Sequence, residues 1–266
     1  MHALRELERV EWRVLGALRF VDATTRAPVE GPLVLQAEGA VLTRNRSGLY
    51  VIRHWDALSA HEAEFSAPPA DPAPASRVLS VAVNDPSGRY LPVIAAVPLP
   101  RSPAPALAAD SLFQAQQVPL YPSPSASVGS NWAVLRISLS ETASGDALGG
   151  ALLRVRSNGS VLARGLTDWR GEALVPVAGV PVTTFSDNPD AVLISEIEVR
   201  LQALFDPATG SRTPMAQVRA GRAPQRLPSV DPAALEDAAA ALPQTERNLA
   251  IAARRAQSLS MNLSLP

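Results

Sequence analysis

Residues 150–175 read GALLRVRSNGSVLARGLTDWRGEALV, and this stretch decides the fold class. Its apolar segments are separated by two polar turn sequences, SNG at residues 157–159 and DWRG at residues 168–171. Asn and Gly tolerate positive φ, and an Asp side chain can accept the backbone N–H groups of a tight turn. The stretch therefore predicts three consecutive strands joined by two tight turns.

A second stretch, SEIEVRLQA at residues 195–203, shows the pattern of a single strand most clearly. Apolar and polar side chains alternate along it: Ile197, Val199, Leu201 and Ala203 against Glu196, Glu198, Arg200 and Gln202. A period of two is typical of antiparallel sheets with one buried face. Residues 12–20 and 135–139 alternate in the same way. The sequence thus predicts a mostly β protein with two immunoglobulin-like antiparallel β-sandwiches and a short helical C-terminal segment.

An internal repeat and clusters of proline divide the chain. Residues 31–52 can be laid on residues 150–175 with small gaps, since both read Gly, apolar strand, Gly and then x-Val-Leu-x-Arg. Residues 98–127 are rich in proline, which makes a segment extended and semi-rigid. We predict β-sandwich module 1 at residues 1–98, a Pro-rich linker at 99–129, β-sandwich module 2 at 130–206, an Arg- and Pro-containing linker at 207–229, and at 230–266 a helical tail with a terminal strand-like segment.

The tail differs from the rest in composition. Asp231 suits an N-cap, Pro232 suits the first helical position, and the residues after them are helix-forming. A second helix is expected after Pro243, with an apolar stripe as a candidate partner contact: Leu249, Ala253, Ala256 and Leu259. Helices this short need a packing partner, either the chain's own sandwich or a neighbouring chain. We expect deletion of residues 230–266 to leave both sandwiches folded and to prevent assembly.

Composition excludes several classes of function. The chain has no cysteine, which rules out disulfides, thiolate catalysis and Cys-type metal sites. Its formal net charge is −1, so no global field favours nucleic acid or an anionic membrane. No run approaches the ~20 apolar residues of a membrane span, and residues 1–13 carry charges where a secretory signal would be apolar. We expect a cytoplasmic protein that binds no nucleic acid.

Candidate catalytic and metal-binding residues are few. His54 and His61, with Glu62 and Glu64, could form a metal or acid–base site, although their spacing matches no compact ligand motif and a surface role is favoured. Aspartates 168, 187 and 190 could gather around Ca²⁺, but turn formation explains each of them. No G-x-S-x-G, P-loop or G-x-G-x-x-G motif is present. We therefore predict a non-enzyme without cofactor or metal.

Two features indicate a contact surface instead. Residues 211–226 contain four arginines and no acid: Arg212, Arg219, Arg222 and Arg226. Such a segment is either a solvated linker or a surface for nucleic acid or an acidic protein partner. Trp169, in a turn expected to be exposed, is the second candidate for partner contact.

Module 2 resembles a known family. GALLRV at residues 150–155, followed by LTDWRGEA at residues 166–173, is similar to the repeat of carboxypeptidase-regulatory-like, prealbumin-like β-sandwich domains. The resemblance implies a structural turn made by Thr167, Asp168 and Gly171, and it transfers no catalytic residue. Such domains are typically non-catalytic appendages or assembly modules.

The expected role follows from this resemblance. The general build looks like that of accessory subunits of phage-tail-like contractile particles. The expected partners are other protein subunits of a large assembly, further copies of the chain among them. A ligand-binding or adhesive β-sandwich module for carbohydrate or protein is the alternative.

Overall fold

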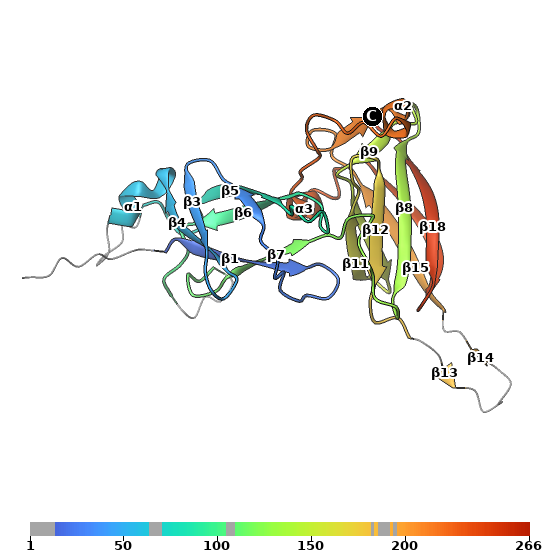
Figure 1. Cartoon of the computed structure of the whole chain (residues 1–266), viewed down its shortest axis with the longest axis horizontal. Helices are drawn as coiled ribbons and strands as arrows, with labels where there is room; N and C mark the ends of the chain where they lie inside the picture. Colours follow the sequence, from blue (N-terminus) through green and yellow to red (C-terminus); the bar gives the residue numbers. More distant parts are fainter. Residues whose placement is uncertain (1–13, 64–70, 105–109, 182–183, 186–191, 194–195) are drawn as a thin grey trace, which may run out of the picture. The chain divides into compact units, whose positions relative to one another are not determined.

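The computed structural model describes residues 14–63, 71–104, 110–181, 184–185, 192–193 and 196–266. It confirms the predicted mostly β fold, with few and short helices (Figure 1). The strands before residue 130 are β1 Gly16–Asp22, β2 Val34–Gln36, β3 Ala40–Arg44, β4 Tyr50–Trp55, β5 Arg77–Asn84, β6 Val93–Leu99 and β7 Gln116–Leu120. The strands after it are β8 Ala133–Glu141, β9 Ala147–Gly149, β10 Leu152–Ser157, β11 Ser160–Leu166, β12 Glu172–Val177, β13 Thr184–Phe185, β14 Val192–Leu193, β15 Glu196–Leu204, β16 Ser211–Thr213, β17 Gln244–Ala252 and β18 Ala256–Leu263. The helices are η1 Asp56–Leu58, α1 Ser59–Ala63, α2 Met215–Arg219 and α3 Pro232–Asp237.

The chain divides into two compact units. Unit 1 comprises Met1–Arg19, Ala37–Val81 and Ala96–Val118, and unit 2 comprises Phe20–Gln36, Ala82–Ala95 and Pro119–Pro266. In unit 1, β4 pairs with β1 and β3 in antiparallel register, and Leu18, Ile52 and Leu58 are buried.

Unit 2 contains a sandwich of two sheets. One sheet has the order β11-β10-β15-β17 and is antiparallel throughout. The other has the order β12-β8-β9-β16, with β18 added to β8 in parallel. The alternation predicted for residues 195–203 is confirmed for the apolar face, because Val199, Leu201 and Ala203 lie in the core between the sheets while Arg200 is exposed. Gln202 of the polar face is buried, where Arg154 donates to its side chain. Leu135, Ile137 and Leu139 of β8 join the same core.

The tail is only partly helical. Asp231 caps α3 as predicted, since its Oδ1 accepts a hydrogen bond from Ala233 N at 2.9 Å. The second helix, predicted after Pro243, is wrong: β17 and β18 occupy that stretch. The apolar residues there also fit a period of two, and the alternating set Ile251, Met261 and Leu263 is buried in the sandwich core. Burial against two sheets therefore outweighs the helix propensity of the alanines.

Both strands of the tail belong to the sandwich of the same chain. Strand β17 pairs with β15 from Glu196↔Ala252 to Leu204↔Gln244. The terminal strand-like segment of the predicted tail lies largely in β18, which pairs with β8 of the same chain.

The two predicted linkers contain regular structure. Strand β7 lies within residues 99–129 and belongs to the sheet β3-β4-β1-β7. Strand β16, which pairs with β9, and helix α2 lie within residues 207–229. In the part of the chain that the structure describes, no helix has the length and apolar character needed to cross a membrane.

Candidate functional site

The turn between β11 and β12, at residues 167–171, is held by side-chain hydrogen bonds. Thr167 is buried, and its Oγ1 accepts from Ala151 N at 2.8 Å and donates to Leu148 O at 2.7 Å. Leu148 lies on β9, and Ala151 directly precedes β10. The Thr167 hydroxyl therefore connects the β11–β12 turn with the β9–β10 connection.

Asp168 and Gly171 set the shape of the same turn. Asp168 Oδ1 accepts from Arg170 N at 2.8 Å and from Glu172 N at 3.0 Å. Its Oδ2 accepts from Arg170 Nε at 2.9 Å. Gly171 has φ +71°, and a Cβ there would overlap the carbonyl oxygen of Leu139. The three residues quoted for the family resemblance thus act together in one turn, and their polar atoms are used within the fold.

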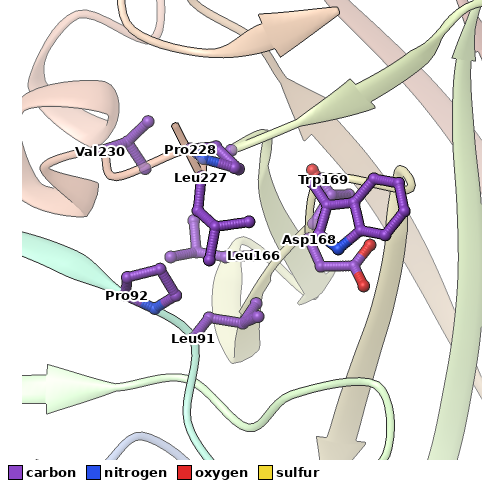
Figure 2. Close-up of a pocket in the computed structure, with 10 residues that line it drawn as sticks. Leu91, Pro92, Leu166, Asp168, Trp169, Leu227, Pro228 and Val230 are labelled. Carbon is purple, nitrogen blue, oxygen red and sulfur yellow. The ribbon is translucent and has the colours of Figure 1, made fainter. Parts of the chain in front are cut away.

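Beside this turn lies a small apolar notch, shown in Figure 2. Its volume is about 40 Å³, little more than the ~30 Å³ that one water occupies in the liquid. All of its lining residues belong to unit 2: Leu91, Pro92, Gly150, Leu166, Thr167, Asp168, Trp169, Leu227, Pro228 and Val230. Leu227 is 44% exposed and points toward Leu91 in Figure 2. The notch has room for part of one apolar side chain.

Trp169 stands at this notch and is partly exposed. The guanidinium carbon of Arg170 lies 5.9 Å from the centre of its ring, within the range of a cation–π contact. Arg170 is also bonded to Asp168. The turn therefore holds the Arg170 guanidinium in place, and this group contacts the Trp169 indole.

The structure separates the four arginines of residues 211–226. Arg212 lies on β16 and forms an ion pair with Glu141 at 3.5 Å. Arg219, Arg222 and Arg226 are exposed, and none of them has an ion-pair partner among the described residues. Arg226 directly precedes Leu227 in the sequence but is not among the residues that line the notch.

The predicted contact stripe of the tail does not form a surface. Ala253 is buried in the sandwich core, and Leu249 packs against that core from β17. Leu259 packs against it from β18, while Ala256 is exposed at the start of the same strand. Three of these residues therefore belong to the sandwich core or pack against it, and none of the four lines the notch.

An ion-pair cluster that the sequence did not indicate attaches α3 to the sheet β11-β10-β15-β17. Glu236 accepts from Arg164 at 2.6 and 3.0 Å and from Arg154 at 3.4 Å. Arg154 also donates to Gln202 Oε1 at 2.6 and 3.0 Å. Burial disfavours the charged form of Glu236, but the bonds and charges of Arg164 and Arg154 outweigh burial and lower its pKa. No sequence motif marks this cluster, because its members are far apart along the chain.

The histidine cluster forms in part. His54 Nδ1 lies 2.6 Å from Glu62 Oε2, and His54 Nε2 lies 3.0 Å from Asp56 Oδ1. The hydrogen bond with Glu62 and then that with Asp56 raise the pKa of His54. His61 lies on α1, the helix that carries Glu62, and Glu64 lies outside the described residues. Among the described residues no group of three or more His, Asp or Glu is arranged to hold a metal ion, and Asp187 and Asp190 lie outside those residues.

Comparison with solved structures finds a protein of low similarity. The Klebsiella pneumoniae 5-hydroxyisourate hydrolase matches 49% of this chain and 89% of its own, with 16% identity and a TM-score of 0.23. No protein-family model matches the chain. No curated protein matches it either.

Proposed function

We propose that this chain is a non-catalytic structural subunit of a multiprotein assembly, built on a β-sandwich of the carboxypeptidase-regulatory-like, prealbumin-like type. The observation that carries the proposal is the notch beside the 167–171 turn. It combines Trp169 with the exposed Leu227 at one corner of the sandwich, and the exposed Arg226 directly precedes Leu227 in the chain. Trp and Arg are the residues most enriched where protein interfaces gain their energy.

The charge of the neighbouring segment supports a protein partner. Arg219 and Arg222 are exposed and lack acidic neighbours within the described chain, so an acidic surface would gain contacts that this chain does not supply. The notch takes part of one apolar side chain, as a contact in a protein interface would, and its volume is far below the ~300 Å³ of a small-molecule pocket.

The best candidate for the assembly is a phage-tail-like contractile injection particle, in which the chain would serve as an accessory subunit. The β-sandwich architecture is what supports the assignment to a contractile particle. Genes for sheath, tube and baseplate proteins beside this one would support it, whereas glycan-utilisation neighbours would support a ligand-binding module instead.

The test compares native complexes with the purified chain. A tagged chain is expressed at natural level in its source, the complex is isolated, and its mass is compared with that of the chain alone. We expect a large complex for the natural sequence, and its loss in the variant Trp169→Ala/Leu227→Asp with the sandwich still folded by circular dichroism.

The matched control is Leu162→Asp. Leu162 is 41% exposed on β11, similar to Leu227, but it does not line the notch. It should leave the complex intact. A natural chain found only as a free species, or equal loss of the complex in both variants, would contradict the docking role of the notch.

A further inference from the structure

Strand β18 lies at an edge of its sheet, and its apolar side chains face the sandwich core. It pairs with β8 in parallel, and no other strand of the described chain pairs with it. Met261 and Leu263 are buried in the core, and Leu259 and Leu265 pack against it. The edge of β8, together with the core beside it, therefore accepts an extended segment with apolar residues at every second position.

Few contacts hold this strand to its sequence neighbour β17. Gln257 Nε2 donates to Ala250 O at 2.7 Å, and Arg247 Nη1 donates to Ser260 O at 3.3 Å. These side-chain bonds replace a backbone ladder between the two strands. The binding of β18 thus depends mainly on pairing with β8 and on packing against the core. Every copy of the chain has the same β8 and the same core, so β18 of one copy could bind to another copy in the same way.

The sequence of β18 lacks the usual protection of an edge strand. Residues 256–266 read AQSLSMNLSLP and contain no charged residue. Natural edge strands commonly carry charges or proline that prevent pairing with other chains. Here the outward positions hold small polar side chains, Ser258, Ser260 and Asn262, which do not oppose such pairing.

The connection from β17 to β18 is short and strained. It consists of residues 253–255, and Arg254 has φ +62°. A residue with a Cβ is disfavoured in this left-handed region. An extended connection would bring Arg254 back to an ordinary conformation, and short strained hinges favour the exchange of the element that follows them.

We propose that β18 is an exchangeable strand that joins copies of this chain. The strand of one copy pairs with β8 of a second copy, in the same parallel register, and residues 253–255 open to span the two. Exchange in both directions gives a closed dimer, and exchange from each copy to the next gives a chain of subunits. This names one partner of the proposed structural subunit, a second copy, and so deepens that function.

The test uses introduced cysteines, since the chain has none of its own. Ser138 and Ser260 face each other in the β8–β18 register and are both exposed. A Ser138→Cys chain and a Ser260→Cys chain with different tags are co-expressed, purified through both tags and oxidised. We expect a disulfide between the two chains, because exchange places residue 260 of one copy beside residue 138 of the other.

Variants at the hinge provide the matched comparison. Arg254→Gly removes the strain, whereas Arg254→Val increases it, and both lose the bond from Arg254 Nε to Asn131 Oδ1. The ratio of exchanged dimer to monomer should be at least about fivefold higher in the Val variant than in the Gly variant.

Three results would overturn the proposal. One is the absence of the mixed disulfide. Another is a disulfide-linked homodimer that forms as abundantly as the mixed product when the Ser260→Cys chain is expressed and oxidised alone, which would indicate edge-to-edge pairing of two β18 strands. The last is an equal dimer fraction in the two hinge variants. All measurements use the purified chain, so exchange can fail while the docking role of the notch stands.

Discussion

At the scale of single residues, the turn at residues 167–171 shows how few positions determine a chain reversal. Asp168 provides the side-chain oxygen that accepts two backbone N–H groups of the turn, Thr167 accepts the N–H of Ala151 beside it, and Gly171 provides a left-handed conformation that most residues with a Cβ adopt only with strain. Their effects on stability should therefore be separable by substitution.

Gly171→Ala should lower the free energy of unfolding of unit 2 by about 3 kcal/mol, from left-handed strain plus overlap with a backbone carbonyl. Gly159 is the matched control, because it has φ +80° and open space around it. Gly159→Ala should cost only about 1 kcal/mol. Urea unfolding followed by tryptophan fluorescence measures both, and equal losses would contradict the role assigned to the Leu139 carbonyl.

Asp168→Ala should cost about 1–2 kcal/mol, since it leaves two backbone N–H groups of the turn without their acceptor. Asp168→Asn keeps an acceptor oxygen and loses only charge, so it should recover at least half of that loss. The same unfolding experiment applies. An Asn variant as unstable as the Ala variant would show that the ion pair with Arg170, and not the turn, accounts for the effect.

At the scale of elements, two short helices are attached to sheets by charged side chains. Helix α1 contributes Glu62 to His54 on β4, and helix α3 contributes Glu236 to Arg154 and Arg164 on neighbouring strands. Both attachments depend on ionisation, so both make pH-dependent contributions to stability.

The pKa of His54 should lie above 6.5, because both ring nitrogens face carboxylates and only the protonated ring donates to both. Its stabilising contribution is complete below pH 6.5 and is lost as the pH rises through the raised pKa of the folded state. NMR titration of the imidazole measures this. Glu62→Gln should lower the pKa more than Asp56→Asn, and the reverse order would contradict the assignment.

Glu236→Gln should destabilise unit 2 by about 1–2 kcal/mol, since the hydrogen bonds from Arg164 and Arg154 lose their charged acceptor. Glu236 has a lowered pKa, so its contribution is present above the ordinary value of 4.5 and is lost as the pH falls through the folded value. Glu246→Gln is the control, because its ion pair with Arg200 is more exposed and should contribute less than about 1 kcal/mol. Equal effects in urea unfolding would contradict an attachment role for α3.

At the scale of the whole molecule, residues 244–266 are part of the sandwich and not an appendage. A chain that ends at Pro243 loses a strand from each sheet and the buried Ile251, Met261 and Leu263. Each such side chain contributes about 1.5–3 kcal/mol on burial. This loss is comparable with the ~5–15 kcal/mol that stabilises an ordinary domain.

We therefore expect unit 2 of this truncated chain to unfold without a cooperative transition in a circular dichroism melt. A chain that ends at Leu263 keeps both strands and should retain the transition. A sharp melt of unit 2 in the shorter chain would restore the separable tail that the sequence suggested.

The sequence by itself determined what depends on neighbours along the chain. The period-two alternation of residues 195–203 indicated a half-buried strand, and the SNG turn has the positive φ that its residues permit, +48° at Asn158 and +80° at Gly159. The cap of α3 was also predictable, because an N-cap bond joins residues two positions apart.

Only the tertiary structure decided the rest, because those features depend on residues distant in sequence. Residues 244–263 carry alanines that favour a helix and an alternation that favours strands, and the open edges beside β15 and β8 settled the choice by burying the alternating set. The contact of Glu236 with Arg154 and Arg164 likewise exists only once two strands and a helix have been brought together. Local patterns fix local geometry, whereas burial and charge pairing are decided between segments that the chain order does not connect.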